Sequence, residues 1–431
     1  MPRKASKKIE TPQTPVEETE VEPVQKVIPT PVDGQPPILE ADKVDMEQEI
    51  KEEENRRKRL LLLLLLLLLL LCCVCGLFFS YMMKPKPLPE MVPVVNVNYP
   101  PHYVFSIYGM DQPVGVALSP DGKRVYVAET GGDRLVKVFD RDGNPLFSFA
   151  PPNSSSAQRS PVYLAVNQSG RVFVTDRLQN SIYVYDADGK YLDTILSTDL
   201  SLMEYVSSQL GGIPAGTTFH YSVFENKVHY TVPGQEPKTL PPPEVPQWDP
   251  LGIRFDNGGN LFLTDVSGQD HKVHRFMAPG LEIWPTLYFK PEVFSFGKTG
   301  QNPGEFLYPN IALVDSQNRL YVADGNNGRI STWDLEGKFL FEFGEGTGDG
   351  ALSLPRGAFM DERDRLHVVD AVGQNIKVYD VSGPEPVFLF TFGDWGLDDG
   401  LFNYPNDIVL DQNGRLYIAD RENNRVQVWS Y

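Results

Sequence analysis

The chain has 431 residues, with 36 Gly, 37 Pro, 24 Phe and 19 Tyr, a composition that favours many strands and turns over long helices. Its net charge is −18, and residues 84–431 carry 28 basic against 43 acidic side chains. Because an acidic body repels phosphate backbones, nucleic acid is not expected as a partner.

Residues 1–59 have the composition of a disordered tail. They are rich in Pro, Glu, Lys and Thr and contain no aromatic residue. Such a segment cannot bury enough apolar surface to offset the loss of chain entropy on folding. We therefore predict disorder over 1–59, with at most a weak helix over Asp45–Arg59.

Residues 60–83 form an uncharged run that begins with twelve leucines, Leu60–Leu71. As a helix, 24 residues extend about 36 Å, enough to cross a hydrocarbon core of about 30 Å. The run starts too late and is too long for a cleaved signal peptide. We predict one transmembrane helix over 60–83. It holds all three cysteines, and acylation of Cys72, Cys73 or Cys75 is an alternative to a purely structural role.

The charges beside this run predict its orientation. Four basic residues, 56–59, precede the span directly, whereas Lys84 and Lys86 follow it. The excess of basic residues marks the cytoplasmic side. We expect a single-pass protein of the cell membrane with its N-terminus in the cytoplasm, a Pro-rich stalk over 84–100 and an extracytoplasmic C-terminal body.

The body over 101–431 is built from repeats. A six-residue strand pattern such as RLYVAD or RVFVTD recurs and ends at an acid, namely at Glu129, Asp176, Asp265, Asp324, Asp370 and Asp420. A polar turn precedes each of these strands and a third strand follows it; a fourth strand follows most of them. Units of four strands repeated at intervals of about 45–50 residues are typical of a β-propeller.

The repeat resembles the NHL repeat, most closely over 304–334 and over the closing residues 404–431. The resemblance covers about 101–431 and implies an all-β fold, a six-bladed β-propeller of the NHL and TolB-like kind. One interval between the repeated acids is 89 residues long. We read residues 197–247 as an insertion that carries a hairpin over Phe219–Val232, with a seventh blade as the alternative.

The last repeat supplies only three strands, which would leave a raw sheet edge at Arg425–Ser430. The segment His102–Gly109 has the pattern of the fourth strands found in other units. We predict that it pairs with Arg425–Ser430 and closes the ring.

In propellers, the loops that enter each blade and the loops between its second and third strands share one face around the central channel. This arrangement predicts a ligand-binding face made by Arg134, Tyr163, Asn310, Arg329, Arg356, Asn406, Asp407 and Arg425. Such a face would suit an anionic or polar ligand. The alternative for each Arg is an ion pair with a neighbouring Asp that holds the blades together.

Catalytic and metal sites are not predicted. Asp at the end of a strand commonly bonds backbone N–H groups in the following turn, which favours a structural role for the repeated acids. Similarity to six-bladed amidating lyases and lactonases raises a metal-dependent hydrolase or lyase as the alternative. The six histidines show no set of three that would converge on the channel.

The sequence thus favours a non-catalytic binding protein without a cofactor. Its propeller would hold a protein, peptide or glycan on the channel-mouth face. A structural scaffold within a membrane complex is a further alternative.

Overall fold

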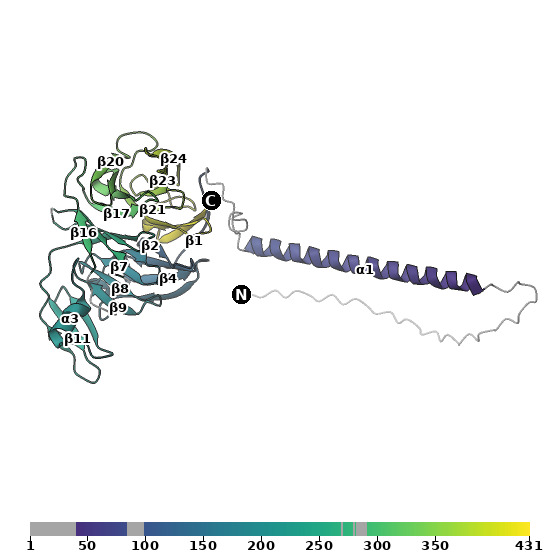
Figure 1. The fold of residues 1–431 in the computed structure, drawn as a ribbon, viewed down its shortest axis with the longest axis horizontal. Coiled ribbons are helices and arrows are strands. Elements are labelled where there is room, and N and C mark those ends of the chain that lie inside the picture. Colours follow the sequence, from purple (N-terminus) through teal and green to yellow (C-terminus); the bar gives the residue numbers. More distant parts are fainter. Residues whose placement is uncertain (1–39, 84–98, 269, 279–280, 282–290) are drawn as a thin grey trace, which may run out of the picture. The chain divides into compact units, whose positions relative to one another are not determined.

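The computed structural model describes residues 40–83, 99–268, 270–278, 281 and 291–431. The chain separates into two compact units, Met1–Met82 and Met83–Tyr431. Helix α1 (Glu40–Met83) represents the first unit, and strands dominate the second (Figure 1).

Helix α1 is longer than the sequence predicted. Residues 40–59, expected in a disordered tail with a weak helix over Asp45–Arg59, form its first turns. They are rich in Glu, Lys and Arg, which favour helix, and Lys58 pairs with Glu54 one turn earlier at 3.4 Å. The adjoining leucines belong to the same helix, so residues 40–59 extend a helix that is already formed and do not need an unfavourable nucleation step of their own. Residues 1–39 and 84–98 of the predicted tail and stalk lie outside the described residues.

The segment Lys51–Phe79 of α1 contains an 18-residue window with a mean hydropathy of 3.4, and none of that window is buried. It is long and apolar enough to cross a membrane.

Within the described residues of the second unit, six antiparallel sheets have four strands each. We number them in chain order. Sheets 1 to 3 are β2–β5 (Pro113–Leu118, Arg124–Glu129, Val136–Asp140, Pro145–Phe149), β6–β9 (Pro161–Val166, Val172–Asp176, Ser181–Tyr185, Tyr191–Ile195) and β13–β16 (Pro250–Phe255, Leu261–Asp265, Lys272–Phe276, Val293–Phe296).

Sheets 4 to 6 contain the better-matched repeats and the chain end. They are β17–β20 (Pro309–Val314, Arg319–Asp324, Arg329–Asp334, Phe339–Phe343), β21–β24 (Pro355–Met360, Arg365–Asp370, Asn375–Asp380, Val387–Phe392) and β25–β27 with β1 (Pro405–Leu410, Arg415–Asp420, Arg425–Ser430, His102–Ile107).

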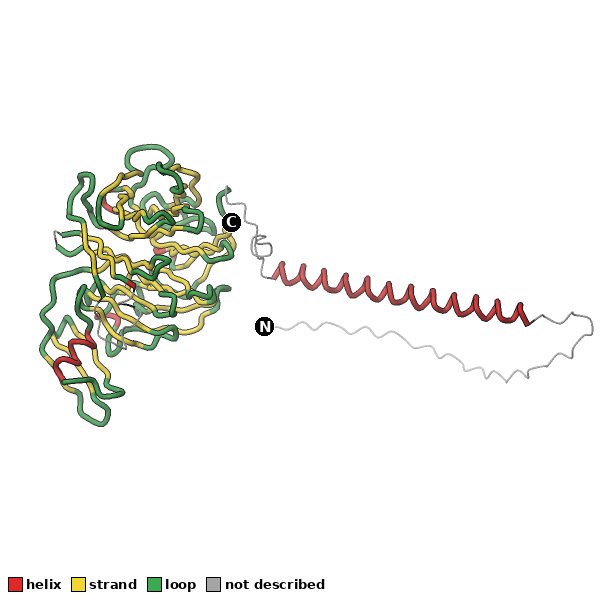
Figure 2. Tube along the Cα trace, in the orientation of Figure 1, coloured by secondary structure: helices red, strands yellow, loops and turns green. Residues whose placement is uncertain are grey.

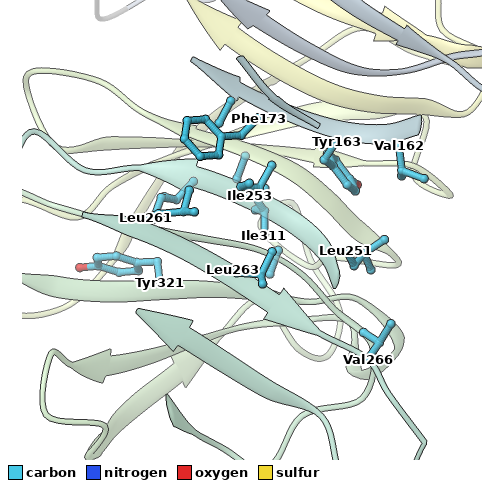
Figure 3. Packing of buried hydrophobic residues seen from close by; sticks show 14 of the residues in the cluster. Val162, Tyr163, Phe173, Leu251, Ile253, Leu261, Leu263, Val266, Ile311 and Tyr321 are labelled. Atoms are coloured by element: carbon cyan, nitrogen blue, oxygen red, sulfur yellow. The ribbon is translucent and has the colours of Figure 1, made fainter. Parts of the chain in front are cut away.

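The first strands of the six sheets surround one axis. Each packs against the first strands of the sheets before and after it, in the order β2, β6, β13, β17, β21, β25 and back to β2. Figure 2 shows the strands of this unit in yellow. Apolar side chains fill the space between neighbouring sheets; Figure 3 shows Phe173, Ile253 and Tyr321 among them. The prediction of a β-propeller is confirmed.

Strand β1 pairs with β27 along Tyr103↔Trp429 and Ile107↔Val426, as the sequence predicted. The rings of Tyr103 and Trp429 meet edge to face at 6.2 Å. Ile107 is buried in a cluster shared by sheets 6 and 1. The last strand of the chain therefore has a partner on both sides, β26 and β1.

Residues 197–247 form a small module with its own core. Helix α3 (Leu202–Leu210) packs on β10 (Thr218–Ser222) of a three-stranded sheet completed by β11 (Lys227–Thr231) and β12 (Lys238–Leu240). The predicted hairpin is present, but α3 was not anticipated. The ring passes directly from β6 to β13, so this sheet is not one of its blades.

The ring is narrow because glycine alternates with a side chain at the third position of the inner strands. Going round the ring, this position holds Gly115, Tyr163, Gly252, Ile311, Gly357 and Asp407. A Cβ atom on Gly252 would lie 1.6 Å from the carbonyl oxygen of Asn310 in the next sheet. Only glycine permits so close an approach of the two backbones.

Candidate ligand-binding face

At one end of each sheet, the loop that enters the first strand lies next to the loop that connects the second and third strands. The first residue of every inner strand pairs with the last residue of the second strand, as in Pro113↔Glu129 and Pro405↔Asp420. The loop that enters the sheet and the loop between its second and third strands therefore meet at the same end. We call this side of the ring the lead-in face and the opposite side the turn face.

The repeated acids build the lead-in face. Each accepts a hydrogen bond from a backbone N–H of the loop that enters its own sheet, 16–18 residues earlier in the chain. The donors are Asp111, Ser160, Asp249, Leu307, Leu354 and Asn403. The acids thus clamp the loops onto the sheets, which agrees with the structural role expected for them.

Arg329 and Arg425 occupy matching places beside two of these acids. Arg329 is 1% exposed; its Nε lies 3.0 Å from Asp324, and its Nη2 donates to the carbonyls of Asn302 and Glu305. Arg425 repeats the pattern with Asp420 at 2.8 Å. Burial raises the pKa of Asp324 to about 6, although Arg329 opposes the shift. The two guanidinium groups therefore hold loops, as the alternative interpretation proposed.

Arg134 also donates its side-chain hydrogen bonds to backbone carbonyl groups of the protein. It has a left-handed backbone, with a φ of 53°, and donates to the carbonyl oxygens of Thr130, Ser156 and Arg159 at 3.1–3.3 Å. None of these partners lies on an inner strand. Arg134, Arg329 and Arg425 are therefore separate from the residues on the channel.

The other five predicted residues come together on the inner strands. Arg356 donates to Asn310 Oδ1 at 2.9 Å, and Asn406 donates to Tyr163 Oη at 3.2 Å. Burial raises the pKa of Tyr163, so its hydroxyl stays protonated. Asp407 lies beside this group, fully buried.

Sequence reasoning missed the partner of Asp407. Arg254 on β13 donates from Nη2 to Asp407 Oδ1 at 2.5 Å. Sheets 3 and 6 lie opposite each other in the ring, so this ion pair spans the channel. Burial raises the pKa of Asp407 more than Arg254 lowers it. The signal was present in the sequence, because Arg254 is the single charge in the otherwise apolar strand Pro250–Phe255.

Aromatic side chains stand at the start of two inner strands in an unusual backbone conformation. Tyr308 and Tyr404 directly precede Pro309 and Pro405, and both have a φ of 57°. Bulky residues rarely adopt positive φ, and such strain is concentrated at functional sites. Arg356 Nη2 donates to the hydroxyl of Tyr404 at 3.3 Å, which connects the axis to the rim.

Four large apolar side chains on the lead-in face are more than half exposed. Trp395 and Leu397, in the loop that enters sheet 6, are 66% and 68% exposed. Tyr108, in the loop that enters sheet 1, and Val372, between β22 and β23, are more than half exposed. The sequence analysis did not identify these residues, although the segment GDWGLDDG places two apolar residues among loop-forming ones.

The histidines do not assemble a metal site in the described part of the chain, where no group of three His, Cys, Asp or Glu could hold a metal ion. His220 and His229 face each other on β10 and β11, with stacked rings 4.7 Å apart. His367 is buried and contacts the hydroxyl of Tyr431 at 2.6 Å. Burial lowers the pKa of His367 to about 4.

Removing one partner of the ion pair between Arg254 and Asp407 should destabilise the protein more than removing both partners, because the remaining charge stays buried and unpaired. Asp407→Asn leaves Arg254 buried without its carboxylate, so we expect the free energy of unfolding to fall by about 3 kcal/mol. The double variant Arg254→Met/Asp407→Asn removes both charges and should regain most of that loss. Denaturant unfolding of the full chain in detergent measures both. Wild-type stability of Asp407→Asn would show that the pair does not support the ring.

The closing blade matches a known family. The model of the NHL repeat matches residues 402–429. A stretch of 50 residues is 48% identical to "Protein brain tumor" of Drosophila melanogaster; the match covers 12% of this chain and 5% of that protein.

Two solved structures have similar folds. Streptogramin B lyase is 15% identical, with a TM-score of 0.48 over 77% of this chain and 98% of its own. A catalytically inactive variant of virginiamycin B lyase from Staphylococcus aureus is 16% identical, with a TM-score of 0.46 over 76% and 98%. The chain is therefore a β-propeller of six repeated sheets whose closing repeat matches the model of the NHL repeat.

Proposed function

We propose that the propeller binds a protein or peptide partner on its lead-in face, with a glycan as the alternative ligand. The observation that carries this proposal is the exposure of Trp395 and Leu397, together with that of Tyr108 and Val372, on loops of that one face. Aromatic residues dominate the binding energy of protein interfaces, and exposed apolar patches mark them.

The polar groups of the face suit recognition rather than a reacting centre. Arg356 and Asn310 bond each other on the axis, and the acids bond their loops. These internal bonds keep the face rigid, which lowers the entropic cost of binding. NHL repeats often mediate protein binding, which agrees with this role.

The lead-in face also contains a small cavity. It has a volume of about 290 Å³ and lies between residues 246–248, at the end of the inserted module, and Asp265, Lys272 and His274 of sheet 3. The buried indole N–H of Trp248 has no hydrogen-bond partner among the described residues. The polar lining, which includes Asp265, Asp270 and Lys272, suits a polar side chain of the partner.

Truncation of the exposed apolar pair tests this function. In the full chain expressed in membranes, Trp395→Ala/Leu397→Ala should reduce the partner recovered by cross-linking by about tenfold or more, the usual effect of losing a hot spot. The matched control Val387→Ala/Leu389→Ala removes exposed apolar side chains from the outer strand β24 and should leave recovery unchanged. Equal recovery with both double variants would contradict a binding role for the lead-in face.

We further propose that α1 spans the cell membrane with the N-terminus in the cytoplasm and the propeller outside. The basic residues 56–59 before the span support this orientation. A protease added to intact cells should remove the propeller and leave an epitope at the N-terminus intact. Cleavage of the N-terminal epitope with a protected propeller would reverse the orientation.

A further inference from the structure

A second cavity lies on the turn face, away from the proposed protein-binding surface. Its volume is about 520 Å³, within the range of small-molecule sites. The turns between the first and second strands of sheets 3 to 6 line it, among them Asp256, Ser316, Asp361 and Gln412. Sheets 1 and 2 contribute no lining residue, so the cavity is off-centre on this face.

Arg254 gives the cavity a charged floor. It lines the cavity, is 9% exposed, and reaches towards the axis to pair with Asp407 on the third position of β25. Because this ion pair spans the channel, it lies between the cavity and the lead-in face. A ligand would therefore enter and leave from the turn face alone.

The carboxylates of the lining fall into two groups. Asp315, Asp361 and Asp411 form ion pairs with Arg319, Arg365 and Arg141. Asp256, Glu362 and Asp364 line the cavity without a Lys or Arg partner among the described residues.

The second group leaves the cavity with excess negative charge. Among the lining arginines, Arg363 alone lacks a carboxylate partner within the described chain, so one cation faces three acids. This surplus favours a ligand with a cationic group.

At the floor of the cavity, Arg254 favours an anionic group of the ligand, in contrast to the acids that line the rest of the cavity. Arg254 donates through Nη1 and Nη2, but its buried Nε has no acceptor among the described residues. Arg254 lines the cavity, so its positive charge faces an entering ligand, whereas the Nε atom itself is closed off from it. A carboxylate is the strongest acceptor for a guanidinium group.

A ligand that satisfies both ends carries an ammonium group and a carboxylate close together. We propose that the turn-face cavity binds a small zwitterion of the α-amino acid class. Its carboxylate meets Arg254 at the floor, and its ammonium meets Asp256, Glu362 and Asp364. Phe255 and Phe359, which also line the cavity, contact the apolar part of its side chain.

The test uses the full chain in detergent and calorimetric titration with single probes. The probes are the common free amino acids, a diamine, succinate and glucose, all at the same pH. We expect saturable binding of at least one amino acid and none of the diamine, succinate or glucose. Glu362→Gln and Asp364→Asn should each weaken binding by about tenfold, because each removes a charge-assisted hydrogen bond.

Asp349→Asn serves as the matched control, because Asp349 is an exposed acid in the loop that enters sheet 5 on the other face. It should leave the affinity unchanged. Met360→Trp should abolish binding by filling the cavity, while the thermal midpoint of each variant reports that the ring is folded.

Three results would overturn the proposal. The first is no saturable binding of any amino acid by the folded wild type. The second is binding of the diamine, succinate or glucose as tight as that of the amino acids. The third is amino acid binding that survives Met360→Trp. None of these outcomes bears on the Trp395/Leu397 surface, so the two proposals can fail separately.

Discussion

The pairing of β1 with β27 is the constraint on which the rest of the structure depends. It joins residues at opposite ends of the propeller, Ile107 and Val426, and covers the edge that the last repeat would otherwise expose. It also places β25 against β2, because sheet 6 can complete the ring only when its fourth strand is present. The channel and both of its mouths exist only in the closed ring.

Closure explains why buried charge is tolerated on the axis. Arg254 and Asp407 belong to opposite sheets, so they meet only when all six inner strands stand at their final spacing. The glycines at alternate inner positions set that spacing by letting neighbouring backbones approach. Either charge alone would be costly in this position, and a pair limits the cost while fixing the register of the two sheets.

The two faces of the ring differ because the acidic side chains of the repeats have different partners on each face. On the lead-in face, acids such as Asp420 and Asp370 bind loop N–H groups, and Arg425 and Arg329 add ion pairs, so the loops present a rigid apolar surface. On the turn face, the acids that follow the first strands hold their own turns, and the cavity there is lined by Asp256, Glu362 and Asp364, which have no Lys or Arg partner among the described residues. The same repeat thus forms the two surfaces for which we propose a protein partner and a small zwitterion.

Much of this could be predicted from the sequence, because the repeats report local structure. Strand patterns ending at Asp324 or Asp420 indicated the sheets, and a spare fourth-strand pattern at His102–Gly109 indicated the closure. The predicted face was divided: Tyr163, Asn310, Arg356, Asn406 and Asp407 meet, whereas Arg134, Arg329 and Arg425 hold loops.

Three features could not be predicted from the sequence, because they depend on contacts between distant residues or on the surroundings of a single residue. Arg254 and Asp407 are 153 positions apart, and no repeat pattern connects them. Helix α3 has only nine residues, too few for a clear helical period, and relies on a local core and the cap at Ser201. Exposure of Trp395 depends on how its loop folds over sheet 6, which composition does not reveal.

Hydrogen exchange of the full chain with residues 102–107 deleted tests the central role of closure most directly. If the ring depends on the pairing of β1 with β27, the amides of β13–β15, on the opposite side, should lose protection together with those of β25–β27. A loss confined to sheet 6, with wild-type protection in β13–β15, would contradict the account.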